Sequence, residues 1–287
     1  MMNIVDNSRL HKNAVTSSVF CQDNLELLKS QPDESVDLIY CDILYGTGKN
    51  FGDFQDLKPI RSEIEAHYLP RLKEMHRVLK STGSIYLQMD TRINHWIRCL
   101  LDEVFGYNNF RNEIIWCYSG GGRKKKDFAE KHDVIYRYSK TKNYTFNDVR
   151  IPYTIGGGTD TALKSGKIMD KNINGKVHNW KPNEEGKIPE DWWCIPFINP
   201  MSNERVGYST QKPKALIERI VKASSNEGDL VADYYLGSGT TAVVCKELNR
   251  NFIGCDINPK AIEITKNRIA SQEAIDIAKA EKFLNLI

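Results

Sequence analysis

The chain has 287 residues, 40% of them hydrophobic and 27% charged, with a formal net charge of +3 at pH 7. This length and apolar content suit one large α/β domain with an insertion, or two domains, and exclude a chain too short to bury a core. The sequence pI of about 8.3 is lower than the value of ~9 that marks an overtly nucleic-acid-binding domain.

The first half of the chain alternates short apolar runs with helical patterns. Val36–Cys41 is an apolar run typical of a parallel strand buried on both faces. Apolar residues between Ile64 and Leu79 recur at helical spacing. In order, the sequence predicts a strand at 19–21, a helix at 25–29, a strand at 36–41, a loop at 46–56, a helix at 62–79, a strand at 84–89, a helix at 92–104, and strands at 112–117 and 133–137.

The middle of the chain differs in composition. From 139 to 205 the periodicity fades and Gly, Asn, Lys and Pro dominate, so we predict an inserted, loop-rich module. Residues 121–190 carry 15 Lys and Arg against 9 Asp and Glu, which concentrates positive charge in this part. Taken alone, this charge favours a solvated loop region over a binding surface.

Regular alternation resumes after the insert. The sequence predicts a helix at 213–225, a strand at 230–233, a helix at 241–248, a strand at 251–255 and a helix from 259. Such alternation predicts an α/β fold with a doubly wound, mostly parallel sheet covered by helices on both faces. We expect three parts, at 1–138, 139–205 and 206–287.

Cysteine spacing and hydropathy bear on metal binding, on disulfide bonds and on the cellular compartment of the protein. None of the seven cysteines is in CxxC spacing, and no HExxH or clustered Cys/His motif occurs, so we expect no metal site and no disulfide framework. No signal-peptide core and no run approaching 18 apolar residues is present. We therefore expect a soluble, cytoplasmic protein without membrane partners, in which Cys41 and Cys255 are buried thiols.

A glycine turn follows the strand at 230–233. Gly237 and Gly239 permit a tight turn and a close approach of a ligand to the backbone. Asp256 comes 19 residues after Gly237, the spacing at which an acid on the next strand reaches ribose hydroxyls. The third glycine of a dinucleotide motif and the GK[ST] of a triphosphate loop are missing. The segment is either only a turn or half of a site for a nucleoside without phosphates, such as S-adenosylmethionine.

Asp42 and Tyr45 follow the strand at 36–41. They should lie at the carboxyl edge of the sheet, where open α/β sheets place their sites. The alternative is structural, with Asp42 as a cap or turn residue and Tyr45 as a core aromatic. Neither residue decides between these interpretations by itself.

Four segments together resemble the amino-group DNA methyltransferases, in the permuted (beta) class whose catalytic motif precedes the cofactor motif. Asp42–Tyr45 (DILY) stands where that family has DPPY, and 233–240 (DYYLGSGT) stands where it has DPFxGSGT. Thr210–Pro213 (TQKP) matches as it stands, and 23–28 resembles the amino-terminal segment of the family. The resemblance covers roughly 19–140 and 205–272.

The resemblance implies a Rossmann-like methyltransferase fold, S-adenosylmethionine as cofactor and double-stranded DNA as substrate. It implies catalytic roles for Asp42, Ile43, Leu44 and Tyr45. It implies cofactor binding by Asp23, Asp42, Lys212, Asp233, Leu236, Gly237, Ser238, Gly239, Thr240, Thr241 and Asp256. The family's aspartate version acts on adenine N6 and its serine version on cytosine N4, so Asp42 implies adenine, with cytosine as the alternative.

The expected chemistry explains these residue types. The lone pair of an exocyclic amino group is delocalised into the base, so the nitrogen is a poor nucleophile. Asp42 and the carbonyl of Ile43 or Leu44 could accept both amino hydrogens and free that lone pair for direct methyl transfer. Tyr45 would stack on a base that has been flipped out of the duplex. The loop at 46–56 could then close over the site.

Both prolines of the family motif are absent. Because proline fixes φ, Ile43-Leu44 should give a looser turn than Pro-Pro. Backbone carbonyls survive any change of side chain, so we expect activity. A degenerate protein that binds DNA and cofactor without catalysis, and a methyltransferase acting on RNA or another substrate, are the alternatives.

With a DNA substrate in view, the basic segment becomes the candidate for DNA reading. Its residues would hold phosphates and fix the register on the duplex, and the insert at 139–205 would enter the major groove. Trp192 and Trp193 are expected to pack rather than read bases. A homodimer and a separate restriction endonuclease, as part of a restriction–modification pair, are open partners. The DNA-binding candidates are Arg123, Lys124, Lys125 and Lys126.

Overall fold

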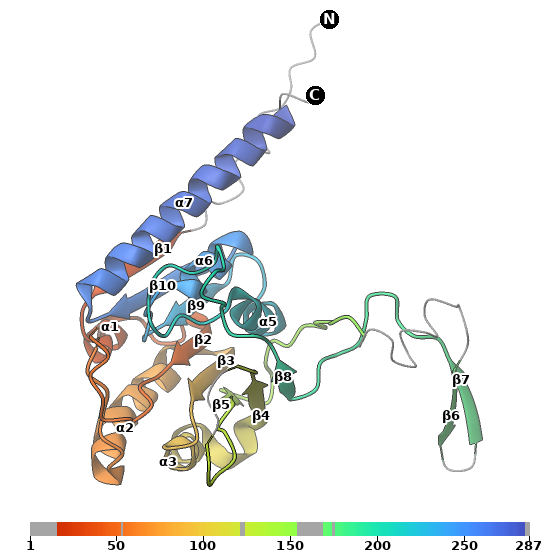
Figure 1. Cartoon of the computed structure of the whole chain (residues 1–287), viewed down its shortest axis with the longest axis horizontal. Coiled ribbons are helices and arrows are strands. Elements are labelled where there is room, and N and C mark those ends of the chain that lie inside the picture. The colour runs from red at the N-terminus through yellow and green to blue at the C-terminus, as the bar shows by residue number, and fades with distance from the viewer. Residues whose placement is uncertain (1–15, 53, 121–123, 154–168, 174–175, 285–287) are drawn as a thin grey trace, which may run out of the picture.

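The predicted doubly wound α/β fold is confirmed. The structure, a computed structural model, describes residues 16–52, 54–120, 124–153, 169–173 and 176–284. An eight-stranded sheet with the order β1-β10-β9-β2-β3-β5-β4-β8 forms its centre (Figure 1). The strands are β1 (Ser17–Cys21), β2 (Val36–Asp42), β3 (Leu79–Met89), β4 (Phe110–Cys117), β5 (His132–Ser139), β8 (Trp192–Cys194), β9 (Leu230–Asp233) and β10 (Asn251–Asp256).

Neighbouring strands of the sheet are mostly parallel. β1, β10, β9, β2 and β3 run the same way, β5 is antiparallel to both of its neighbours β3 and β4, and β8 is parallel to β4. The strand of the DILY motif pairs with the strand of the glycine turn, with Leu38 opposite Val231 and Ile39 opposite Ala232. Two motifs almost 200 residues apart therefore lie side by side in the sheet.

Helices cover both faces of the sheet. The helices are α1 (Asn24–Ser30), α2 (Arg61–Val78), α3 (Asn94–Leu101), α5 (Lys214–Ser224), α6 (Thr240–Glu247) and α7 (Pro259–Leu284). α1, α2 and α3 contribute to one hydrophobic cluster, which takes Ile39 and Cys41 from β2. α5, α6 and α7 contribute to a second cluster, which takes Leu38 and Tyr40. Because side chains alternate along a strand, β2 is buried on both faces, as its apolar run predicts.

Some element boundaries differ from the prediction. The strand expected at 84–89 begins at Leu79, which pairs with Val36 of β2; the register then shifts, and Ser84 pairs with Leu38. The helix expected at 92–104 is α3 followed by a π-helical turn, η2 (Asp102–Gly106), and a 3₁₀ turn, η3 (Tyr107–Asn109). Gly106, the last residue of η2, has a φ of 85° and separates it from η3. These differences leave the order of elements unchanged.

The range 139–205 is less loop-like than its composition predicts. Its last part contains β8, which extends the main sheet beside β4. β6 (Met169–Ile173) and β7 (Lys176–Trp180) form an antiparallel hairpin, which stands apart from the sheet at the end of an arm (Figure 1). Trp193 is buried under the sheet edge with its indole N–H bonded to the Glu190 carbonyl, as expected of a packing residue, whereas Trp192 is exposed.

The described residues also bear on the cysteine and membrane predictions. All seven cysteines are free, and Cys41 and Cys255 are fully buried, as predicted. No helix within the described ranges has the length and apolarity needed to cross a membrane.

Candidate active site

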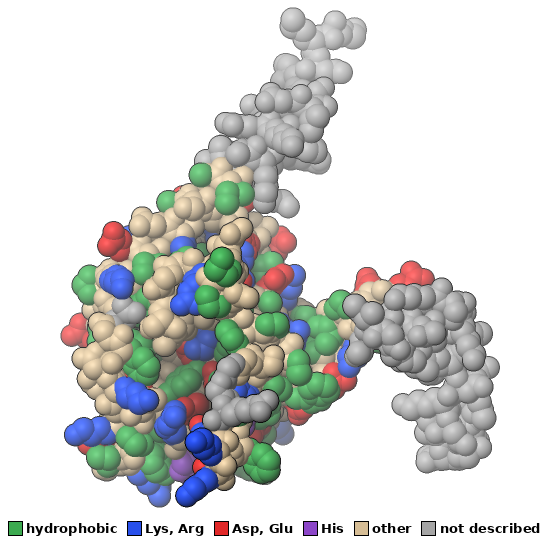
Figure 2. Space-filling model, viewed as in Figure 1, with side chains coloured by type: hydrophobic (Ala, Val, Ile, Leu, Met, Phe, Trp, Pro, Cys, Tyr) green, Lys and Arg blue, Asp and Glu red, His purple; other side chains and the backbone are tan. Residues whose placement is uncertain are grey.

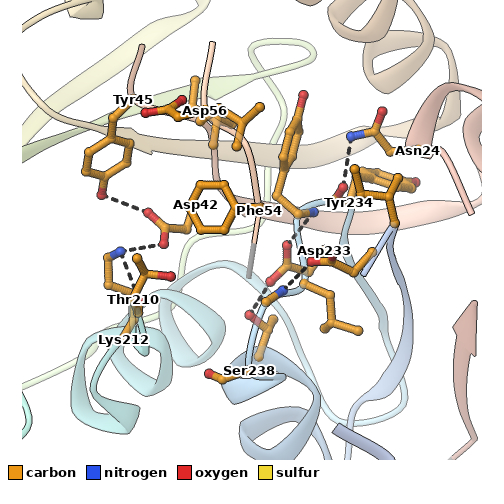
Figure 3. Close-up of a pocket in the computed structure, with 18 of the residues that line it drawn as sticks. Asn24, Asp42, Tyr45, Phe54, Asp56, Thr210, Lys212, Asp233, Tyr234 and Ser238 are labelled. Carbon is orange, nitrogen blue, oxygen red and sulfur yellow. Dashed lines mark hydrogen bonds and ion pairs between the residues drawn. The ribbon is translucent and has the colours of Figure 1, made fainter. Parts of the chain in front are cut away.

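Four aspartates meet at the carboxyl edge of the sheet. Asp42, Asp233 and Asp256 are the last residues of β2, β9 and β10, and Asp23 follows β1 by two residues. These strands are parallel neighbours, so their ends lie at one edge. One cavity at this edge is lined by all four residues. Figure 3 labels two of them, Asp42 and Asp233.

The structure brings the residues of both predicted motifs into this cavity. Of the residues assigned to catalysis or cofactor binding, all except Gly239 line it. Those that do are Asp23, Asp42, Ile43, Leu44, Tyr45, Lys212, Asp233, Leu236, Gly237, Ser238, Thr240, Thr241 and Asp256. Gly239 lies behind the lining, where a Cβ atom would come within 2.3 Å of the Thr265 hydroxyl on α7.

The glycine turn links β9 to α6. Gly237 and Gly239 have φ values of 52° and 74°, in the left-handed region that favours glycine. The Gly237 N–H donates to Oδ2 of Asp256 at 2.9 Å, and the Thr241 hydroxyl donates to Oδ2 of Asp233 at 2.6 Å. Asp256, on the neighbouring strand β10, therefore binds the turn itself, and Asp233, at the end of β9, binds the start of α6.

Asp23 is held by an arginine that the sequence did not single out. Its Oδ1 caps α1 by accepting the Leu25 N–H at 2.8 Å, and its Oδ2 pairs with Arg71 of α2 at 2.8 Å. Arg71 also donates to Oδ1 of Asn24 at 2.6 Å, and the Asn24 amide donates to the Tyr234 carbonyl at 2.9 Å. This network ties α1 and α2 to the strand end that precedes the glycine turn.

Both oxygens of the Asp42 carboxylate have partners. Lys212 forms an ion pair with Oδ2, and the Tyr45 hydroxyl lies 2.8 Å from Oδ1 (Figure 3). The Lys212 ammonium also lies 5.3 Å from the centre of the Tyr45 ring. Lys212, assigned to the cofactor from the sequence, therefore contacts the DILY motif directly.

The Tyr45 hydroxyl reaches a second carboxylate. It lies 2.7 Å from Oδ2 of Asp133, the second residue of β5. The Gln88 amide donates to the same oxygen at 2.8 Å, and the Tyr40 hydroxyl donates to Oε1 of Gln88 at 2.7 Å. A chain of hydrogen bonds therefore runs under the motif from β2 through β3 to β5.

Hydrogen bonds hold the motif where the family has prolines. The Tyr68 hydroxyl on α2 donates to the Leu44 carbonyl at 2.9 Å, and the Ile43 N–H donates to the Gln88 carbonyl at 3.1 Å. Ile43 itself is buried. Its turn is thus fixed by packing and by partners on both sides, although it lacks the φ restriction of proline.

The loop at 46–56 forms one wall of the cavity. Asp56 is buried and accepts the N–H groups of Gly46 and Thr47 at 3.1 and 2.7 Å, which folds the loop back on itself. Phe51 and Phe54 stack with ring centres 5.1 Å apart, and both line the cavity. The loop therefore presents an aromatic surface to the site.

Burial shifts the protonation of the cavity residues. It raises the pKa of Asp233 to about 7, raises the pKa values of Asp42 and Asp256, and lowers the pKa of His67 to about 4 with help from the charge of Arg71. The Lys212 ammonium opposes the shift at Asp42. A bound ligand with a positive charge would therefore lower the pKa values of these carboxyls and favour their ionised forms.

Several cavity residues were missed by sequence reasoning. Arg71 and His67 lie on α2 and carry no motif, and Tyr208 precedes the TQKP segment. Asn24 and Thr210 lie within segments that resemble the family, but they were not assigned to the site. Asp133 was placed in a strand but not in the site. Its position follows from the antiparallel direction of β5, which short strand patterns do not reveal.

The basic DNA-binding candidates lie in the connection between β4 and β5. Lys124, Lys125 and Lys126 are exposed, and Lys124 pairs with Glu130 at 2.8 Å, whereas Arg123 lies outside the described residues. Because β4 runs parallel to β2, this connection leaves the sheet at the edge that carries Asp42. Figure 2 shows Lys and Arg side chains gathered over the part of the molecule with α2, α3 and these strands.

Comparison with known proteins agrees with this geometry. A sequence model of the family described as DNA methylase, the N6 and N4 amino-methyltransferases, matches residues 36–267. The chain is 34% identical to the type II methyltransferase M.HpaI of Haemophilus parainfluenzae over 88% of its own length and 74% of that protein. It is also 34% identical to the DNA adenine methyltransferase YhdJ of Escherichia coli (strain K12), over 91% of this chain and 86% of that one.

Solved structures share the fold at lower identity. PvuII DNA methyltransferase, described as cytosine-N4-specific, superposes with a TM-score of 0.63 at 19% identity, over 88% of this chain and 87% of that one. The M1.HpyAVI–SAM complex gives 0.57 at 19% identity, over 88% of this chain and 99% of that one. With the match over most of the chain and two relatives at 34% identity, this protein belongs to the DNA methylase family of N6/N4 amino-methyltransferases.

Proposed function

We propose that the protein is an S-adenosylmethionine-dependent DNA methyltransferase that modifies adenine N6 within a specific duplex sequence. One observation carries this proposal. The DILY motif and the glycine turn end adjacent parallel strands and line one cavity, with the Asp42 carboxylate between Lys212 and Tyr45. A group that activates an amine and a group that cradles a nucleoside are thus brought together.

The cavity suits the proposed cofactor. Its lining includes Asp23, Asp42, Asp56, Asp233 and Asp256. Such an acidic site disfavours phosphates and favours a cationic ligand. The residues that would hold the cofactor are those of the glycine turn, with Asp23 and Asp256 beside it. S-adenosylmethionine supplies an electrophilic methyl group on a cationic sulfur.

Asp42 and a backbone carbonyl would accept the two hydrogens of the target amino group. The Leu44 carbonyl already accepts a hydrogen bond from Tyr68, which favours the Ile43 carbonyl as the second acceptor. These acceptors localise the lone pair on the nitrogen and stabilise the positive charge that develops there during methyl transfer. The chain's own contribution is positioning and electrostatics, without a covalent intermediate.

Tyr45 would stack on the flipped base, and Phe51 and Phe54 would cover it. Their rings line the same cavity as Asp42, so a base bound to that carboxylate meets aromatic surface. We further propose that 139–205 and the lysines at 124–126 contact the duplex, with 1–138 and 206–287 as the two halves of the methyltransferase core. Its open partners are a second copy and a separate restriction endonuclease.

Analysis of the modified nucleoside tests the assignment. Duplex DNA is incubated with protein and labelled S-adenosylmethionine, digested and separated, and we expect N6-methyladenine. N4-methylcytosine would instead assign the cytosine alternative. Cofactor binding without transfer to any duplex would identify a degenerate protein, and preferential labelling of RNA would show that the substrate is not DNA. Sequencing host DNA for modified bases, with and without the protein, then gives the recognition sequence.

Replacing Lys212 by Met should move the acidic limb of the pH–rate profile to higher pH. Lys212 lowers the pKa of Asp42 against the effect of burial, and Asp42 accepts amino hydrogens only when ionised. Without the ammonium the carboxyl stays protonated to higher pH, so the acidic limb of the transfer rate should move upward in pH. kcat/KM measured across pH checks this. Lys214→Met, which removes an ammonium paired with Glu247, is the matched control, and an unshifted K212M profile would contradict the prediction.

Cofactor binding near pH 7 should release protons. Burial raises the pKa of Asp233 to about 7, so part of this carboxyl is protonated at that pH, and burial also raises the pKa values of Asp42 and Asp256. A sulfonium cation favours the ionised form and lowers their pKa values, which expels protons. Calorimetric titration in buffers of different ionisation enthalpy measures the number released. S-adenosylhomocysteine lacks the charge and serves as control; equal release with both ligands would show that the sulfonium is not responsible.

Replacing Lys124, Lys125 and Lys126 together by Ala should weaken DNA binding without changing sequence preference. Each lysine that contacts a phosphate contributes about 0.9 to the slope of log affinity against log salt concentration. The slope should fall accordingly in the triple variant, as measured by fluorescence anisotropy at several salt concentrations. Lys222→Ala, on the surface of α5, should leave the slope unchanged. An unaltered slope in the triple variant would remove these lysines from the DNA interface.

A further inference from the structure

We propose that Asp133 is a positioning residue that takes the hydrogen bond of the Tyr45 hydroxyl away from Asp42, and so frees Asp42 to accept the target amino group. This inference rests on the proposed function. It concerns a residue outside both family motifs, on the strand whose direction differs from the rest of the sheet.

The direction of β5 explains how Asp133 reaches the site. Parallel strands bring their last residues to the carboxyl edge, whereas an antiparallel strand brings its first residues there. Asp133 is the second residue of β5, and Val134 beside it pairs with Met89, the last residue of β3. Asp133 is 4% exposed, so its carboxyl group is almost fully removed from water and needs partners.

The partners of Asp133 hold it in one orientation. Gln88 donates to Oδ2 at 2.8 Å, and the Tyr118 hydroxyl donates to Oδ1 at 3.2 Å. The Gln88 amide is itself oriented, because its Oε1 accepts the Tyr40 hydroxyl at 2.7 Å. With one oxygen bound by Gln88 of β3 and the other by Tyr118, which follows β4, Asp133 presents a fixed acceptor to Tyr45.

The Tyr45 hydroxyl has one hydrogen for two neighbouring carboxyl groups, those of Asp42 and Asp133. The Tyr45 hydroxyl lies 2.8 Å from Asp42 and 2.7 Å from Asp133, but it carries a single hydrogen. Both short contacts are hydrogen bonds only when one carboxyl is protonated. When both are ionised, the hydroxyl donates to one of them and leaves the other free.

The free carboxylate is the one that the reaction uses. If Tyr45 donates to Asp133, Oδ1 of Asp42 can accept an amino hydrogen while Lys212 remains on Oδ2. If Asp133 cannot accept, the hydroxyl stays on Asp42 and competes with the target base. Tyr45 is then held away from Asp133, and its ring loses the fixed orientation needed for stacking.

A double-mutant cycle tests this proposal. Asp133→Asn keeps the shape but replaces the carboxylate by a neutral, weaker acceptor, so the Tyr45 hydroxyl returns to the ionised Asp42, and we expect single-turnover methyl transfer to fall on the order of 10-fold. In a Tyr45→Phe background the competing hydroxyl is gone, and the same change should have no further effect. An equal fall in both backgrounds would overturn the proposal, because Asp133 would then act independently of that hydroxyl.

A matched control separates positioning from stability. Tyr138, on the same strand β5, donates its hydroxyl hydrogen to Oδ1 of Asp102 in η2 at 2.5 Å, which gives a second tyrosine–carboxylate pair. Tyr138→Phe should lower thermal stability without changing the single-turnover rate. If D133N does not fold, Asp133→Ser is a smaller neutral substitute with the same expectation.

Carbon NMR of aspartate carboxyls gives a readout that does not depend on methyl transfer. The groups that face Asp42 are Lys212, Tyr45, Asp133, Asp233 and Tyr40, and the negative charge of Asp133 raises the pKa of Asp42. The Asp42 resonance, assigned by its loss in Asp42→Asn, should titrate at lower pH in D133N. An unchanged titration would overturn the coupling. If the wild type methylates no nucleic acid, the proposed function fails, yet the titration still decides whether Asp133 and Asp42 are coupled.

Discussion

Asp42→Asn is expected to lower the single-turnover rate of methyl transfer about 100-fold or more, with cofactor and DNA binding retained. An asparagine keeps the shape of the side chain, but its amide group donates where the carboxylate accepts. It cannot receive the amino hydrogen that would free the lone pair of the target nitrogen. Removing one preorganised electrostatic contact of this kind typically costs about 100- to 1,000-fold in rate. Labelled-methyl transfer with enzyme in excess of duplex measures the chemical step.

Asp37→Asn is the matched control for this prediction. Asp37 lies on the same strand, β2, where it pairs with Lys80 at 2.8 Å and accepts the Leu230 N–H at 2.9 Å. It lies at the amino end of the strand, away from the cavity lining. Its substitution should lower stability and leave the single-turnover rate unchanged. If D42N instead transferred methyl groups at the wild-type rate, Asp42 would have no part in catalysis.

Gly239→Ala is expected to destabilise the fold and disable cofactor binding together. The φ of 74° is in the left-handed region, and a Cβ would lie 2.3 to 2.7 Å from three atoms of the Thr265 side chain on α7. Left-handed strain and overpacking together cost about 2–5 kcal/mol. Because Gly239 precedes the first residue of α6, relief of the clash must move the turn that lines the cavity. Chemical denaturation and calorimetric titration with S-adenosylmethionine measure the two effects.

Gly207→Ala is the control that separates the cost of backbone strain from the cost of a steric clash. Gly207 has a φ of 79°, and a Cβ there would meet no atom within 4 Å. The substitution therefore introduces only the backbone cost, about 1–2 kcal/mol. Cofactor affinity should stay near the wild-type value. Equal loss of affinity in both variants would show that the packing of Gly239 against α7 is not what shapes the turn.

Much of the site was predictable because its residues end parallel strands. The apolar run before Asp42 and the run before Asp233 each predict a buried strand, and a parallel sheet brings their last residues to one edge. The spacing from Gly237 to Asp256 placed a third acid on the next strand, and the structure joins the two by a hydrogen bond. Local patterns were sufficient for these positions because each depends on one strand and the turn that follows it.

Other parts of the site depend on partners distant in the sequence. Arg71 reaches Asp23 only because α2 packs beside α1, and Tyr68 reaches the Leu44 carbonyl from the same helix. The helical spacing of α2 predicts which of its faces is buried, but not which strand end lies against it. The strand β8 was read as loop because three residues are too few to show a period.

The sequence alone determined the order of strands and helices outside 139–205, the two motifs and the acids at the strand ends, because these follow from local periodicity, glycine geometry and residue chemistry. The tertiary structure decided that β2 and β9 are neighbours, that β5 runs against them, and that Lys212 and Tyr45 both contact Asp42. The reason is physical. Strand direction and pairing depend on packing between segments far apart in the chain, and the protonation of a buried carboxylate depends on every charge that the fold brings near it.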